Sequence, residues 1–297
     1  MNFTIAHFSD LHLGPLPRGA ATHDFRLKRL LGNFSWHFHR KHIHSADVAE
    51  ALMRDIQAQK PSHIAFTGDA TNIASPLEFP RLRQWLDRLG EPSWISFVPG
   101  NHDTYVKVAH EKGFAFFDPF MAGDMHQDAA FPYVRLRRNI AFIGLNSAVP
   151  RSFHSAEGWL GPTQRGALRQ RLTELRGKGF YRVVMIHHPP GPGLSARLRA
   201  LQDAVELRDI LCEEVVELAI HGHNHRRMFN WLEKDGTRVP AIGVPSASAG
   251  SANNPAEWNL YSISREGGTW RTDVAVRRWD AAQAQFIAAE KYQVGAL

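Results

Sequence analysis

The chain repeats one pattern, in which a short apolar run ends in a turn that carries histidine and carboxylate side chains. The apolar runs cover residues 3–8, 63–67, 94–98, 140–145, 182–186 and 215–220. Several of them are apolar at consecutive positions, which is typical of strands that are covered on both faces. The chain is therefore expected to fold around buried strands, with its chemically active side chains at the strand ends.

Helical patterns lie between these runs. Val48, Leu52 and Ile56 fall at helical spacing and predict a helix after Ser45, and residues 163–176 and 203–212 also look helical. Strands without long helices are expected at 228–232, 239–244, 258–264 and 270–279. We predict one α/β domain over residues 1–297, a layered αββα arrangement with mixed β-sheets, in which residues 227–297 complete the second sheet. The Ser- and Ala-rich run 245–255 is expected to be a mobile surface loop.

Short motifs at the ends of the predicted strands carry the residue types that bind metals. They are Asp10-Leu-His12, Gly68-Asp69, Gly100-Asn-His-Asp103, His187-His188 and Gly222-His-Asn-His225. The carboxyl ends of neighbouring strands meet at one edge of a sheet, so groups that are distant in sequence can converge there. Imidazole, carboxylate and carboxamide groups without thiolates suit Mn, Fe or Zn ions better than a structural zinc cage. The sequence therefore predicts a divalent metal site.

These motifs, read as D-x-H, G-D, G-N-H-[DE], H and G-H-x-H, resemble the signature of the calcineurin-like metallophosphoesterase superfamily over about residues 3–226. The resemblance implies a four-layer αββα sandwich and two divalent metal ions. It implies that Asp10, His12 and His225 hold one ion. It also implies that Asp69 bridges the ions and that Asn101, His187 and His223 hold the second. The motif leaves the choice between His187 and His188 open and favours His187.

The resemblance also implies a phosphoesterase reaction, in which a hydroxide that bridges the two ions attacks phosphorus. His102 would assist the phosphoryl oxygen or the leaving group, and Asp103 is expected to fix the tautomer of His102. The Gly-Asn-His-Asp and His-His-Pro-Pro pieces resemble bacterial cyclic-nucleotide phosphodiesterases of the class III type, which favours a small phosphodiester substrate. One alternative is a pyrophosphate hydrolase acting on a nucleotide-linked lipid of the UDP-diacylglucosamine type. The other is a non-catalytic scaffold, which the complete ligand set argues against.

The segment 18–44 carries most of the charge imbalance. Six basic residues and one acidic residue, Asp24, give it 6 − 1 = +5 of the formal +6. The basic residues are Arg18, Arg26, Lys28, Arg29, Arg40 and Lys41. Leu27, Leu30, Leu31, Phe34 and Phe38 form an apolar stripe at helical spacing. The segment is either an amphipathic element for an anionic membrane surface or lipid, or a lid packed on the core.

The same charge distribution argues against nucleic acid as a partner, because no basic stripe with interleaved aromatic residues extends beyond this segment. Cys212 is the single cysteine, and the first residues do not read as a signal peptide. A cytoplasmic location is therefore expected, with peripheral attachment to the inner membrane face if the segment 18–44 binds lipid.

Overall fold

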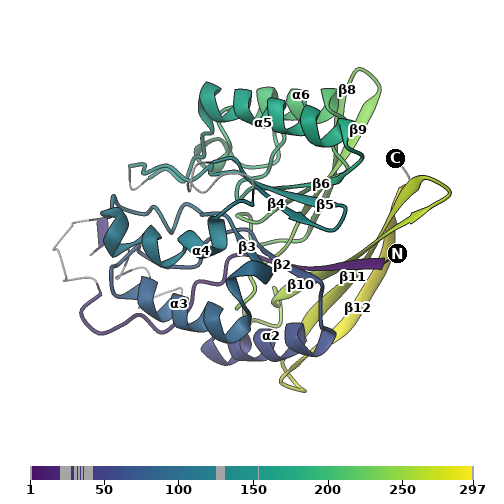
Figure 1. The fold of residues 1–297 in the computed structure, drawn as a ribbon. Helices are drawn as coiled ribbons and strands as arrows, with labels where there is room; N and C mark the ends of the chain where they lie inside the picture. Colours follow the sequence, from purple (N-terminus) through teal and green to yellow (C-terminus); the bar gives the residue numbers. More distant parts are fainter. Residues whose placement is uncertain are drawn as a thin grey trace.

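Two six-stranded sheets pack face to face, and helices cover the outer face of each sheet (Figure 1). The computed structural model describes residues 2–20, 28–29, 32, 34, 36, 43–124, 131–152 and 154–295. The first sheet has the order β12-β11-β10-β1-β2-β3 and the second has the order β4-β5-β6-β7-β9-β8. The predicted αββα fold with mixed sheets is confirmed.

The first sheet has a parallel half and an antiparallel half. The parallel strands are β1 (Asn2–Phe8), β2 (His63–Phe66) and β3 (Ile95–Phe97). Next to β1, the antiparallel strands are β10 (Glu257–Glu266), β11 (Thr269–Asp280) and β12 (Gln285–Val294). The carboxyl ends of β1, β2 and β3 therefore lie at one edge of this sheet.

The second sheet has a parallel centre and antiparallel edges. The parallel strands are β5 (Ile140–Gly144), β6 (Tyr181–Met185), β7 (Leu218–His221) and β9 (Thr237–Gly243). The edges are β4 (Tyr133–Arg137) and β8 (Met228–Lys234). The prediction that residues 227–297 complete the second sheet is correct for β8 and β9 and wrong for β10–β12. Those three strands extend the first sheet, because β10 pairs with β1.

The helices form the outer layers. On the first sheet lie α2 (Ala46–Gln59) and α3 (Glu78–Leu89), with the short α4 (Asp118–Met121) nearby, and on the second lie α5 (Gly161–Gly177) and α6 (Ala204–Glu213) (Figure 1). The helix α2 begins after Ser45 as predicted, and the Ser45 side chain caps it by accepting from Val48 N. Within the part of the chain that the structure describes, four 3₁₀ turns complete the elements: η2 (Pro92–Trp94), η3 (His110–Lys112), η4 (Phe114–Phe116) and η5 (Arg197–Arg199).

Successive side chains of β5 point to opposite faces of the second sheet and so pack into two different layers. Ile140 and Phe142 belong to the core between the sheets, where the Phe142 ring lies 6.3 Å from Phe3 of the first sheet. Ala141 and Ile143 face the opposite way into the core beneath α5 and α6. The second sheet is therefore buried on both faces, as its continuous apolar runs predict.

The run 245–255 departs from the prediction of a mobile surface loop. Its first half is buried, since Ser246, Ala247, Ser248 and Ala249 have almost no exposed surface. Ala247 N donates to Ser9 O at 2.9 Å, which fixes this half beside the end of β1. Only residues 251–254 are fully exposed.

The basic segment 18–44 is partly anchored to the core. Arg29 and Trp36 are buried, and Arg29 donates to the carbonyls of Ile73 at 3.3 Å and Ala74 at 2.5 Å. Phe34 points outward with 60% of its surface exposed. Outside the described residues lie Leu27, Leu30, Leu31 and Phe38 of the predicted stripe and the basic residues Arg26, Arg40 and Lys41.

Among the residues that the structure describes, no helix has both the length and the apolar character needed to cross a membrane.

Candidate metal centre

The predicted ligands converge at the carboxyl ends of strands from both sheets. The first sheet supplies Asp10 and His12 after β1, Asp69 after β2 and Asn101 after β3. The second sheet supplies His187 after β6, and His223 and His225 after β7. The site therefore spans the seam between the two sheets.

A first cluster joins Asp10, His12, Asp69 and His225, whose ligand atoms all lie within 4.8 Å of one another. His225 Nε2 lies 3.1 Å from Asp10 Oδ1 and 3.3 Å from His12 Nε2. His12 Nε2 lies 3.7 Å from Asp69 Oδ2. Two nitrogens and two carboxylates thus face one small volume.

A second cluster joins Asn101, His187 and His223. Asn101 Oδ1 lies 2.8 Å from His223 Nδ1 and 3.1 Å from His187 Nε2, and the two imidazole nitrogens are 3.2 Å apart. Asp69 Oδ2 reaches this cluster too, at 3.4 Å from His187 Nε2. Asp69 Oδ2 therefore lies close to ligand nitrogens of both clusters, a position that is compatible with the predicted bridging role.

Backbone carbonyls hold the outer nitrogens of three of these rings. His12 Nδ1 lies 3.1 Å from Thr71 O, His187 Nδ1 lies 2.7 Å from Thr67 O, and His223 Nε2 lies 2.8 Å from Arg199 O. A carbonyl can only accept, so each outer nitrogen carries the proton. The neutral ring then presents a lone pair to the cluster, which is the tautomer that a metal ligand needs.

The charges of the site also suit cations. Burial opposes ionisation of Asp10 and Asp69, yet the neighbouring imidazoles His225 and His187 hold the pKa of both carboxyls below the ordinary value. Burial likewise disfavours a proton on His187, but the nearby Asp69 carboxylate raises the pKa of His187 to about 9. Burial holds the pKa of His12 and His223 well below the ordinary value. A metal cation can take the place of the proton that Asp69 attracts to His187.

One buried oxygen is left over in the first cluster. Asp10 Oδ1 is inaccessible to solvent and, among the described residues, accepts no hydrogen bond, although His225 Nε2 is close to it. A buried carboxylate oxygen without a donor is costly unless it coordinates a cation. This oxygen, together with the nitrogen and oxygen donors around it, fits the two divalent ions that the sequence predicts.

The backbone of the site is strained. Asp10, His12, Asp69, His223 and His225 have φ values between 40° and 73°, in the left-handed region that non-glycine residues seldom adopt. Such strain persists only where the surrounding structure enforces it, and it concentrates at functional sites.

Close backbone approach requires glycine at two points of the site. A Cβ on Gly222 would lie 1.9 Å from Ser9 Oγ, and one on Gly100 would lie 2.2 Å from Asp69 Oδ1. Larger residues at 100 or 222 would therefore displace the ligands beside them.

His102 and Asp103 have different tasks. The His102 ring lies 4.8 Å from the His12 ring, its backbone N donates to Asp69 Oδ1 at 2.7 Å, and its Nδ1 is held by Asn72 O at 2.7 Å. Asn72 O holds His102 Nδ1, the contact that was expected from Asp103. The buried carboxylate of Asp103 accepts from the backbone N of Gly100 at 2.9 Å and of Thr71 at 2.8 Å. Burial and the charge of Asp69 raise the pKa of Asp103 to about 7.

We predict that Asp103→Ala weakens the fold. The substitution leaves the backbone amides of Gly100 and Thr71 without their buried acceptor, whereas the Thr71 hydroxyl keeps His102 O at 2.9 Å. Unpaired buried donors cost about 1–3 kcal/mol each, so the free energy of unfolding should fall by roughly 3 kcal/mol in urea titrations. Asp103→Asn, which keeps one acceptor oxygen, should lose less. Wild-type stability combined with lost turnover would instead make Asp103 a catalytic residue.

The structure separates His187 from His188. His188 Nδ1 lies 2.8 Å from Ser147 Oγ and its Nε2 lies 3.0 Å from Ala156 O, so both ring nitrogens are engaged away from the clusters. His187 is the member of the pair that faces Asp69 and Asn101.

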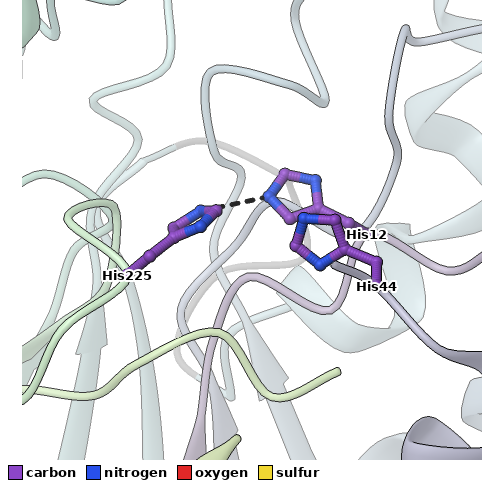
Figure 2. A group of neighbouring side chains, drawn as sticks. All are labelled: His12, His44 and His225. Carbon is purple, nitrogen blue, oxygen red and sulfur yellow. Dashed lines mark hydrogen bonds between the residues drawn. The ribbon is translucent and has the colours of Figure 1, made fainter. Parts of the chain in front are cut away.

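His44 lies beside the first cluster and was not predicted as a site residue. His12, His44 and His225 form a second group of potential ligands, with ligand atoms within 4.8 Å of one another (Figure 2). His44 is buried, and its Nδ1 lies 2.9 Å from Ser248 Oγ. It belongs to no motif and its partner is 204 residues away, so the local sequence carries no signal for its position.

Several known proteins resemble this chain in sequence or in fold. The chain is 24% identical over 279 residues to a "probable cyclic nucleotide phosphodiesterase" of Synechococcus sp., covering 92% of each chain. It resembles a dimetal phosphatase from Danio rerio at a TM-score of 0.65, with 12% identity and 98% of both chains covered. A purple acid phosphatase from yellow lupin seeds matches at a TM-score of 0.62 and 10% identity, over 99% of this chain and 53% of the other.

These two solved structures share the fold. The family comparison matches residues 3–227, the span that holds every strand-end motif described above, to the calcineurin-like phosphoesterases. The chain therefore belongs to the calcineurin-like phosphoesterase family.

Proposed function

We propose that the protein is a binuclear-metal phosphodiesterase that hydrolyses a small phosphodiester of the cyclic-nucleotide type. The observation that carries the proposal is the position of Asp69, which lies 3.7 Å from His12 Nε2 and 3.4 Å from His187 Nε2 and so joins the two ligand clusters. The diester preference is supported by the Synechococcus relative, which is named for that activity.

The residues divide the work of such a reaction. When bound, two divalent ions of the Mn, Fe or Zn type acidify a shared water and stabilise an in-line displacement at phosphorus. Asp69 holds the two clusters at a fixed separation, and the carbonyls of Thr71, Thr67 and Arg199 fix the imidazole tautomers. His102 lies beside the first cluster, with its Nδ1 held by Asn72 O. Because that carbonyl can only accept, Nδ1 carries a proton, and Nε2 can donate to the phosphoryl oxygen or to the leaving group when the ring takes up a second proton.

A substrate panel tests the proposal. The enzyme, loaded with Mn²⁺ or Fe²⁺, is offered 3′,5′-cyclic AMP, bis(p-nitrophenyl) phosphate and p-nitrophenyl phosphate, with chelated enzyme as the control. We expect kcat/KM for the diesters to exceed that for the monoester by at least about tenfold, a difference of about 1.4 kcal/mol in transition-state stabilisation. Hydrolysis confined to the monoester would reject the diesterase assignment and keep only the phosphoesterase family.

A second candidate is a pyrophosphate hydrolase that works on a nucleotide-linked lipid at the inner face of the membrane. It is favoured by Phe34 and Ile43, which expose 60% and 41% of their surfaces on the segment that leads into His44. Buried Trp36 and Arg29 favour a packed lid instead. In the same panel, cleavage of a UDP-linked diacyl sugar and flotation with phosphatidylglycerol vesicles would favour the lipid substrate. We propose the cytoplasm as the location in either case.

A further inference from the structure

His44 is supplied by the segment 18–44 and is held from several sides against the first ligand cluster. Its ring centroid lies 4.5 Å from that of His12 and 5.8 Å from that of His225. Trp36 stacks on it at 6.4 Å with an interplanar angle of 9°. Ser45 N donates to Ser248 O at 2.9 Å, which ties the following residue to the same buried loop. These contacts hold the His44 imidazole in a fixed orientation beside the cluster.

The hydrogen bonds around His44 define its tautomer. Ser246 Oγ donates its single hydrogen to the carbonyl of Asp10 at 2.7 Å, so toward His44 Nδ1, 3.3 Å away, it can only accept. A proton on His44 Nδ1 is the arrangement that lets both hydroxyls, Ser246 Oγ at 3.3 Å and Ser248 Oγ at 2.9 Å, accept from the ring. The neutral ring keeps its lone pair on Nε2. In His12 and His187, too, Nδ1 faces an acceptor, the carbonyls of Thr71 and Thr67, and Nε2 keeps the lone pair.

The distances are compatible with a shared ion. The ligand atoms of His12, His44 and His225 lie within 4.8 Å of one another. Two nitrogens bound to one ion at about 2.1 Å each are at most about 4.2 Å apart, so a shift of less than about 1 Å would bring all three onto one ion. His12 and His225 also belong to the first cluster, whereas Asp10 and Asp69 do not share a 4.8 Å group with His44, so His44 would reach the same ion only after such a shift.

We propose that His44 is an additional ligand of the metal ion held by Asp10, His12, Asp69 and His225. The assignment gives the segment 18–44 a direct part in the metal centre. The added imidazole would also shift the metal preference of the site toward Zn²⁺ and Co²⁺ and away from Mn²⁺, which prefers oxygen donors. The assignment depends on the metal centre and not on which phosphoester is cleaved, so its test is metal binding.

Metal-free protein is titrated with Co²⁺, Zn²⁺ and Mn²⁺, comparing the wild type with His44→Ala and His44→Gln. His110→Ala is the matched control, because His110 is exposed and pairs with Asp118 at 2.8 Å away from the clusters. We expect one of the two Co²⁺ ions to bind about 10–100-fold more weakly in His44→Ala, with an altered visible Co²⁺ spectrum and the second ion unchanged. The ratio of Zn²⁺ to Mn²⁺ affinity should fall in both His44 variants and stay at its wild-type value in His110→Ala.

Two results would overturn the proposal. Wild-type Co²⁺ affinity and spectrum in both His44 variants would place His44 outside the coordination shell. Equal weakening of Zn²⁺ and Mn²⁺, with a lower free energy of unfolding, would assign it a structural role. Because hydrolysis is not the readout, a failure of the phosphodiesterase assignment leaves this test intact.

Discussion

Asp69→Ala is expected to remove at least one of the two ions and to lower kcat by about 10³-fold or more, a loss of about 4 kcal/mol in transition-state stabilisation. The carboxylate is the group shared by the two clusters, at 3.7 Å from His12 Nε2 and 3.4 Å from His187 Nε2. Its other oxygen accepts from His102 N at 2.7 Å, so the same substitution also loosens the loop that carries Asn101 and His102.

Metal content measured by elemental analysis after gel filtration, together with kcat, tests this prediction. Asp87→Ala is a suitable control, because Asp87 is a half-exposed carboxylate paired with Arg83 in α3. Full retention of two ions in Asp69→Ala would contradict a bridging position. Excess metal should restore little activity, because the geometry of the pair is lost along with the affinity.

The second large effect is expected from His102→Ala, which should keep both ions while kcat falls by about 10²–10⁴-fold, the usual contribution of a positioned acid or base. The His102 ring lies 4.8 Å from the His12 ring, but His102 is not one of the residues whose ligand atoms gather in the first cluster, so we assign it to the reaction and not to the metal. Normal turnover in His102→Ala would refute this assignment.

Substrates with different leaving groups distinguish between two possible roles of His102. If it protonates the leaving oxygen, the loss should be large for alkyl esters and small for p-nitrophenyl esters, whose leaving group needs no proton. If it donates to the phosphoryl oxygen, the loss should be similar for both, and His102→Gln should recover part of the rate. Metal analysis on the same samples separates either outcome from a disturbed metal centre.

Much of the fold was predictable because burial on both faces leaves continuous apolar runs. All six early runs are strands, and the helices after Ser45 and at 163–176 and 203–212 are present. The strand β4 was missed because Arg135 and Arg137 interrupt its pattern. Arg135 is nevertheless buried, since carbonyls such as Ala122 O and Pro92 O accept from its guanidinium. The helix α3 was missed as well, although its buried apolar residues fall at helical spacing, so the sequence did carry a signal for it.

The ligand clusters were predictable for a different reason, since each motif combines its residues within a few positions of a strand end. The role of Asp103 and the position of His44 were not predictable, because both depend on which loops meet in space. Asp103 accepts from Thr71, which is 32 residues away, and His44 contacts Ser248. The sheet to which β10–β12 belong was not predictable either. Alternation of apolar and polar residues indicates that a segment is a strand but does not show which strand it pairs with.

The seam position of the site has a thermodynamic consequence. Each cluster takes ligands from both sheets: His225 of the second sheet joins the Asp10 cluster, and Asn101 of the first sheet joins His187 and His223. Ions that bind there link the two sheets to each other and so stabilise their packing. An ion present at 100 times its dissociation constant adds about 2.7 kcal/mol to the folded state. Cellular metal supply would then govern how long the folded chain persists as well as how fast it turns over.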